Sequence, residues 1–219
     1  MKNLFFDSSA LISMSLTCQL RALEKLSEDF AGKFYITSTI KKETIEKALK
    51  TPRFQLEGLR LKNLLDKGVL NIYSDKDLKA DISLLAKKIN STFYTRKRPV
   101  ALVHPGEMST LVAAFVDKSP TVIDERTARL LIEAPQELQK LMEMKLHTRV
   151  RYDKDSLREL QDLFSSMEVL RSSELILSAV QKGYMGPVNK GLLEASLYAL
   201  MFNGCAISTA EIKDYLRFF

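Results

Sequence analysis

Five acidic residues lie beside apolar segments where they could do chemistry together: Asp7, Glu43, Glu107, Asp124 and Glu125. Carboxylates that converge at one place repel each other unless a cation neutralises them. Oxygen ligands in that number select Mg²⁺ or Mn²⁺. Such ions suit phosphoryl chemistry, because they lower the pKa of an attacking water and stabilise the leaving oxygen. The acids therefore favour metal-dependent hydrolysis of a phosphodiester.

The stretch "LFFDSSALIS", residues 4 to 13, has two interpretations. Asp7 and the serines after it stand between an apolar run typical of a strand and another typical of a helix. Asp and Ser side chains cap helices by accepting hydrogen bonds from the first turn. Open parallel sheets also gather their chemistry beyond the carboxyl ends of the strands. The two roles are compatible, so Asp7 can be predicted to hold a cation while Ser8 or Ser9 caps the helix.

The other acids also have an ordinary alternative. Glu107 opens a helix in "HPGEMSTLVAAF", where a first-turn acid suits the helix dipole. Glu43 lies at the margin of an apolar helical stripe, where a surface Glu is common. Asp124 and Glu125 follow the last clear strand, in "TVIDERTARLL". None of these positions is diagnostic by itself.

Strands alternating with helices must position these acids. Apolar runs predict strands at 3–6, 33–37, 69–73 and 121–124. Apolar residues at three- and four-residue spacing predict helices at about 10–30, 39–49, 54–66, 77–90 and 107–118. This alternation predicts an α/β fold with a doubly wound, mainly parallel sheet flanked by helices on both faces. The carboxyl ends of parallel strands lie at the same edge, so Asp7 and the pair at 124–125 are expected to meet there.

The last third of the chain is predicted to be mostly helical, with one short strand within "LHTRVRYD". No Pro/Gly/Ser-rich linker precedes it. We therefore expect residues 1–150 to form the sheet domain and residues 151–219 to form a helical extension packed on it.

Composition indicates the partner and the compartment. The 219 residues carry a net charge of +6, which favours an acidic partner such as nucleic acid. In "STFYTRKRPV", Arg96, Lys97 and Arg98 stand beside two aromatic residues and could bind RNA, although a solvated loop is the plain alternative. No apolar stretch approaches the ~20 residues of a membrane span, and no signal-peptide pattern is seen, so we expect a cytoplasmic protein that does not bind membranes.

Several classes of site are not supported. Neither GxGxxG nor GxxxxGK[ST] occurs, and the two histidines have no zinc-ligand spacing. Phosphatases with an aspartyl nucleophile begin with a strand and an Asp but need a second Asp two residues later, where Ser9 stands. The basic charge together with the acidic site points instead to a nuclease.

The motifs resemble those of the PIN domain ribonucleases over roughly the first 135 residues. In that family, "DSSALI" after the first strand, "IxxE" on an early helix, "GE" opening a later helix and an acidic pair before "xxARLL" recur in this order. Here they are the motifs at 7–12, 40–43, 106–107 and 124–131. The tail from 170 onward has a softer likeness to PIN proteins with a helical C-terminal extension, in a three-layer Rossmann-like fold.

The resemblance implies a Mg²⁺- or Mn²⁺-dependent endoribonuclease. Asp7, Glu43 and Glu107 would belong to its acidic site, with Ser9 hydrogen-bonding within the cluster. The ligands would be Asp7, Glu107 and the pair Asp124 and Glu125. The family often has its key Asp in the second position of that pair, where this chain has a Glu, so either residue could be the fourth acid. RNA is the implied substrate, and a small antitoxin protein and a second copy of the chain are candidate partners.

A second function stays open. The Glu at position 125 also suits a PIN-like RNA-binding or scaffold protein with weak or no activity. The sequence does not distinguish a toxin of a toxin–antitoxin pair from a maturation nuclease or from an unpaired enzyme.

Overall fold

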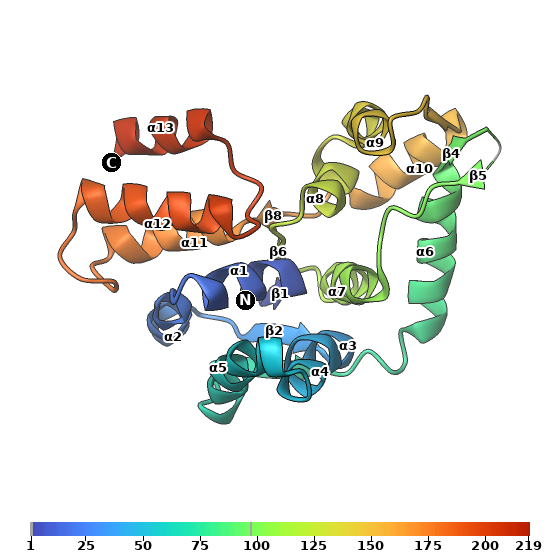
Figure 1. Cartoon of the computed structure of the whole chain (residues 1–219). Coiled ribbons are helices and arrows are strands. Elements are labelled where there is room, and N and C mark those ends of the chain that lie inside the picture. The colour runs from blue at the N-terminus through green and yellow to red at the C-terminus, as the bar shows by residue number, and fades with distance from the viewer. Residues whose placement is uncertain (1, 97) are drawn as a thin grey trace.

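The computed structural model describes residues 2–96 and 98–219. Its centre is a five-stranded, all-parallel sheet with the strand order β3-β2-β1-β6-β8. Helices cover both faces, which gives a three-layer α/β fold and confirms the predicted fold class (Figure 1). The strands are β1 (Leu4–Phe6), β2 (Phe34–Thr37), β3 (Leu70–Tyr73), β6 (Thr121–Val122) and β8 (Val169–Leu170).

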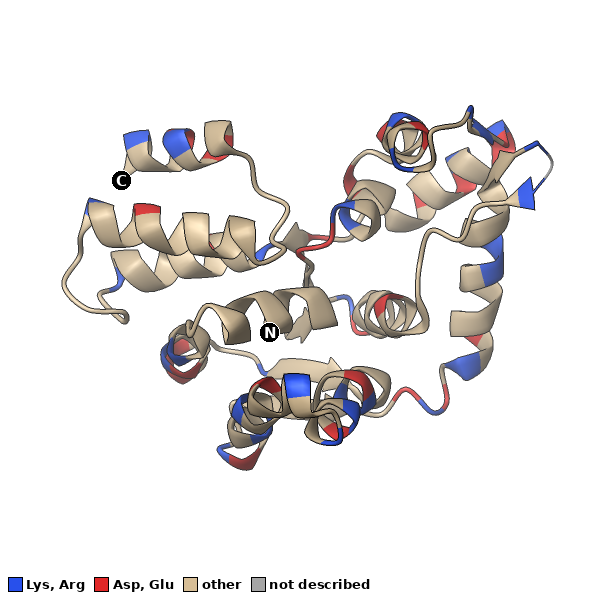
Figure 2. Ribbon diagram, in the orientation of Figure 1, with Lys and Arg blue, Asp and Glu red and all other residues tan. Residues whose placement is uncertain are grey.

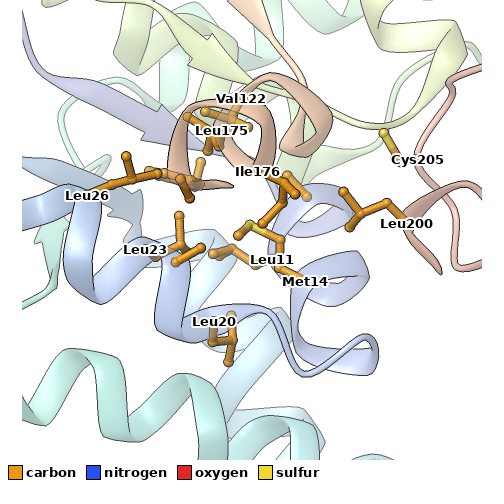
Figure 3. Close-up of a cluster of buried hydrophobic side chains, with 14 of the residues drawn as sticks. Leu11, Met14, Leu20, Leu23, Leu26, Val122, Leu175, Ile176, Leu200 and Cys205 are labelled. Carbon is orange, nitrogen blue, oxygen red and sulfur yellow. The ribbon is translucent and has the colours of Figure 1, made fainter. Parts of the chain in front are cut away.

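Alternate side chains of β1 enter different layers, as the period of a strand requires. Leu4 and Phe6 belong to the larger core, whereas Phe5 packs with Ala113 and Ala114 of the central helix α7 (Pro105–Val116) on the opposite face. The larger core lies under α1 (Ser8–Leu16), α2 (Leu20–Asp29), α5 (Gln55–Asp66), α11 (Ser172–Gln181), α12 (Lys190–Phe202) and α13 (Thr209–Phe218). Figure 3 shows its centre, where Leu11 of α1, Leu23 of α2 and Ile176 of α11 lie close together.

A second apolar core holds the other end of the molecule together (Figure 1). It joins α7 to α6 (Lys79–Thr92), α8 (Arg126–Glu133), α9 (Leu138–Leu146) and α10 (Lys154–Phe164). Beside it stands a small antiparallel sheet of β5 (Arg98–Pro99), β4 (Phe93–Thr95) and β7 (Arg151–Tyr152). The remaining elements are α3 (Ser38–Lys41), the π-helical turn η1 (Lys42–Glu46), α4 (Lys47–Leu49) and the short 3-10 turns η2 (Pro52–Phe54) and η3 (Pro135–Glu137).

The last 69 residues contribute strands as well as helices. The strand β7 completes the small sheet, and β8 forms the edge of the main sheet next to β6. The division into 1–150 and 151–219 stays a prediction. Among the described residues, no helix combines the length and the apolar character that crossing a membrane would need.

The single helix predicted over 10–30 is wrong. The first helix ends at Leu16, and Cys18 adopts a left-handed backbone conformation with φ 58° before α2 begins at Leu20. The Gln19 N–H closes the turn by donating to the carbonyl oxygen of Met14 at 2.9 Å. No glycine or proline marks this break, and apolar residues continue at helical spacing across it.

Candidate active site

Ser9 joins the ends of two neighbouring strands. Asp7 directly follows β1 and caps α1, and its Oδ2 accepts hydrogen bonds from the backbone N–H of Ser9 at 3.0 Å and from the Ser9 hydroxyl at 2.7 Å. The same hydroxyl accepts from the backbone N–H groups of Asp124 at 3.0 Å and Glu125 at 3.3 Å, just beyond β6. A hydroxyl has one proton and two lone pairs, so these contacts are mutually compatible. The cap of α1 is Asp7 itself and not Ser8 or Ser9. The two strand ends meet as expected.

The second oxygen of Asp7 is left without a partner. The side chain has no exposed surface, and no described residue donates a hydrogen bond to its Oδ1. Burial raises the pKa of Asp7, and the charge of Asp124 raises it further, against the lowering effect of the Ser9 hydrogen bonds. An unpaired buried carboxylate oxygen is costly unless a proton or a cation satisfies it. Asp7 therefore presents an oxygen suited to binding a cation.

Glu107 lies in the first turn of α7 and is 9% exposed. Its Oε2 accepts a hydrogen bond from the backbone N–H of His104 at 2.7 Å. Burial, followed by the charges of Asp7, Glu125 and Glu43, raises the pKa of Glu107 to about 7, against this hydrogen bond. Asp7, Glu43 and Glu125 thus each lie within electrostatic reach of Glu107.

Glu43 belongs to the π-helical turn η1, a kind of local distortion often found at functional sites. Its carboxylate lies against Gly106, where an added Cβ would collide with Oε2 and stand 3.1 Å from Cδ. The glycine thus makes room for the acid beside the start of α7. Burial raises the pKa of Glu43, and the positive charge of Lys47 opposes that increase.

The two acids of the pair at 124–125 face different helices. Asp124 is fully buried, and its two oxygens accept hydrogen bonds from the backbone N–H and the hydroxyl of Ser172 at 2.8 and 2.7 Å. Glu125 caps α8 by accepting from the backbone N–H of Ala128 at 2.8 Å. Its other oxygen lies 2.9 Å from the Thr127 hydroxyl. Both oxygens of Asp124 are thus bound to Ser172 at the start of α11. The side chain of Glu125, in contrast, is 34% exposed.

Sequence reasoning missed three residues at this site. Lys145, near the end of α9, lies 3.4 Å from Glu125 and donates a hydrogen bond to Thr127 at 2.8 Å. Ser172 binds Asp124, and His104 precedes the helix of Glu107. The contacts of Lys145 and Ser172 join residues 20 and 48 positions apart, so no local pattern marks them.

The basic run lies away from the acids. Arg96 and Arg98 are exposed on the hairpin between β4 and β5, and Lys97 lies outside the described residues. Figure 1 places this hairpin at the outer end of α6, with α7 and α8 between it and α1, so it does not border the acidic cluster. Figure 2 shows further basic residues nearby, and Arg151 of β7 stands beside Tyr94 in the register of the small sheet.

Among the described residues, no three His, Cys, Asp or Glu side chains are already arranged to hold a metal ion. The side-chain donors near Asp7 are nevertheless oxygens, the carboxylates and the Ser9 hydroxyl, which fit Mg²⁺ or Mn²⁺ rather than a soft metal. No family model, curated protein or solved structure matches this chain. The functional argument therefore depends on the geometry of the site and on the motifs of the sequence.

Proposed function

We propose that this protein is a divalent-metal-dependent endoribonuclease of the PIN type. The observation that supports it most is the unpaired, fully buried Oδ1 of Asp7. It lies where the charges of Glu43, Glu107 and Asp124 converge from segments far apart in the sequence. Four such acids in a protein of net charge +6 suit a cation that handles a phosphodiester.

Asp7, Glu107 and Glu125 are the residues that would hold the metal. The Oδ1 of Asp7 has no partner among the described residues, and the hydrogen bond from His104 occupies only Oε2 of Glu107. We infer that Glu125 is the fourth acid because its side chain is 34% exposed, although its oxygens contact Ala128 and Thr127. Asp124 is fully buried and both of its oxygens bind Ser172. The chemistry that a bound Mg²⁺ or Mn²⁺ supplies is neutralisation of negative charge and a lower pKa for an attacking water.

The protein's own side chains have distinct tasks in this proposal. The Ser9 hydroxyl fixes the rotamer of Asp7 and holds the ends of β1 and β6 at a constant separation. The pKa of Glu107 is raised to about 7 without metal, so near neutral pH its carboxyl group would have to release a proton before Oε1 could bind the cation. Lys145 lies beside Glu125, where its ammonium group can contact a phosphate oxygen of the RNA.

A second candidate function is RNA binding without cleavage. It is favoured by the hydrogen bonds that commit Asp124 to α11 and by the absence, among the described residues, of a preformed set of metal ligands. In this case the acids would be structural caps, and the basic hairpin would provide the binding surface.

Cleavage of a 5′-labelled single-stranded RNA by purified protein separates the two functions. We expect cleavage with Mg²⁺ or Mn²⁺, none with EDTA, and a loss of at least about a hundredfold in Asp7→Asn and Glu107→Gln. Asp66→Asn, at an exposed carboxylate near the end of α5, is the matched control. If the protein binds RNA but does not cleave it under any metal condition, the nuclease proposal is wrong and RNA binding without cleavage is supported.

A further inference from the structure

A pocket of about 380 Å³ adjoins the acidic site and shares Glu43 with it. It lies between α1 and the segment that runs from η1 to α5. Its walls are mostly apolar and include Ile12, Leu16 and Leu61. Because one face of the Glu43 carboxylate lies against Gly106 beside the catalytic acids, a group in this pocket would stand next to the reacting phosphate.

Glu57 lines this pocket and carries an unsatisfied acceptor. Its Oε2 is buried and receives no hydrogen bond from any described residue. An ionised carboxylate can only accept hydrogen bonds, so a suitable occupant must carry N–H or O–H donors on an otherwise flat or apolar body. Burial without such a donor is costly.

Phe54 supplies a stacking surface at the same pocket. The residue is 47% exposed, and the Arg53 guanidinium lies 5.3 Å from the centre of its ring. Exposed aromatic rings in a basic protein stack on unpaired bases of single-stranded nucleic acid. Phe54 and Glu57 therefore offer one face for stacking and one edge for hydrogen bonding.

We propose that this pocket binds a guanine base of the RNA next to the bond that is cut. The inference rests on the proposed nuclease function and names the nucleotide that the site selects. Guanine presents two adjacent donors, N1–H and the exocyclic amino group, and a carboxylate can accept both at once. Adenine and cytosine present only the amino donor, and uracil presents only N3–H.

A cationic side chain of a protein partner is the competing occupant. Lys47 also lines the pocket, and its ammonium group repels a guanidinium or a second ammonium group. A neutral base meets no such repulsion, and Lys47 can contact the phosphate attached to that base. Because Glu43 and Glu57 also line the pocket, its charge alone does not decide between the two occupants. The base is favoured because the pocket adjoins the acids where the proposed function places the RNA.

Binding of labelled hexaribonucleotides in Ca²⁺ or EDTA, measured by fluorescence anisotropy, tests this without requiring cleavage. The hexamers are uridine runs with one central G, inosine, A or C. We expect the wild type to bind the G oligonucleotide about tenfold or more tightly than the A oligonucleotide, the range of one good bidentate base contact. Inosine, which lacks the amino group, should fall between them.

Glu57→Gln should remove most of the preference for G, because one acceptor becomes a donor. Phe54→Ala should weaken binding of all four oligonucleotides, since stacking does not depend on the base. Asp66→Asn, on the same helix as Glu57 and outside the pocket, is the control. It should change neither the preference for G nor the affinity for the four oligonucleotides.

Equal affinity for all four oligonucleotides, no RNA binding at all, or an unchanged preference in Glu57→Gln would each overturn the proposal. So would binding of L-argininamide that depends on Glu57 in a protein indifferent to guanine. If the protein prefers guanine but cuts no RNA, the proposed nuclease function is contradicted, whereas guanine binding in the pocket is supported.

Discussion

Asp124 accepts two hydrogen bonds from one residue, Ser172, through its backbone N–H at 2.8 Å and its hydroxyl at 2.7 Å. All of these atoms are in buried residues. The pair ties the end of β6 to the first turn of α11, and the Ala206 N–H adds a bond at 3.0 Å to the carbonyl oxygen of Asp124. An acid next to the proposed site is thus an anchor for the C-terminal helices.

Substitutions of Asp124 and Glu125 should therefore change the free energy of unfolding by different amounts. Asp124→Asn replaces one buried acceptor with a donor that faces Ser172, so we expect a loss of about 1–3 kcal/mol in the free energy of unfolding. Glu125→Gln keeps an acceptor for the cap of α8 and should cost less than about 1 kcal/mol. Urea unfolding followed by circular dichroism measures both. Equal losses would contradict a structural role specific to Asp124.

Glu107 should make stability depend on pH. Its pKa is raised from 4.5 to about 7 on folding, mainly by burial. Between these values the native state holds a proton that the unfolded state releases, so stability falls as pH rises. The contribution is fully present below about pH 4.5 and is lost as pH rises through about 7, with a size of about 3 kcal/mol.

Glu107→Gln tests this pH dependence, because the amide does not titrate. In the absence of metal, the wild type should lose stability relative to this variant between pH 5 and pH 7.5, measured by urea unfolding at each pH. Parallel stability curves for the two proteins would show that Glu107 titrates normally.

Binding of Mn²⁺ should raise the melting temperature. The ion would satisfy the unpaired Oδ1 of Asp7 only in the folded state. At a concentration a hundredfold above Kd, such linkage gives about 2.7 kcal/mol, or roughly 5–10 °C for a chain of this size. Asp7→Asn should melt at the same temperature with and without Mn²⁺. An unchanged wild-type melting temperature at millimolar Mn²⁺ would count against a metal at this position.

Gly106→Ala should impair catalysis more than folding. The added Cβ collides with the carboxylate of Glu43, the end of a flexible side chain that can move away, and it also comes within 3.1 Å of Ile40. We expect a change of less than about 1 kcal/mol in stability, since alanine favours the helix. RNA cleavage should fall about tenfold as Glu43 is displaced. Full activity would show that the position of Glu43 does not matter.

Much of the fold could be predicted because it depends on local patterns. The strands β1, β2, β3 and β6 coincide with the apolar runs that predicted them, and Asp7 lies where a strand passes into a helix. The strand β7 lies within the segment where a short strand was predicted. The strands β5 and β8 were not predicted, because two residues are too few for any period, and β8 forms only where it pairs with the distant β6. Cys18 breaks a helix without glycine or proline, so the break is fixed by packing.

The candidate site could be predicted in its members but not in its contacts. The sequence marks Asp124 and Glu125 equally, as two acids after a strand. Only the partner of Asp124, Ser172, 48 residues further along the chain, shows that the first acid anchors α11, whereas the second caps α8. The pairing depends on how α11 packs, which no local pattern encodes.

The hairpin between β4 and β5 should contribute to RNA affinity although it lies away from the acids. Arg96 and Arg98 are exposed, and Lys97 stands between them in the sequence. Each phosphate that they neutralise releases counterions, which steepens the salt dependence of binding by about 0.7 for single strands. Replacing all three residues by alanine should flatten that slope by about 1–2 and leave the melting temperature nearly unchanged, because exposed charges contribute little to folding.

A matched triple substitution on the C-terminal helices controls for the loss of net charge. Lys190, Lys213 and Arg217 are exposed on α12 and α13, and changing them to alanine removes the same charge far from the hairpin. Affinities for a single-stranded RNA across a salt series, in EDTA to prevent cleavage, compare the two variants. If both weaken binding alike, the positive charge acts as a diffuse field and the hairpin makes no phosphate contact of its own.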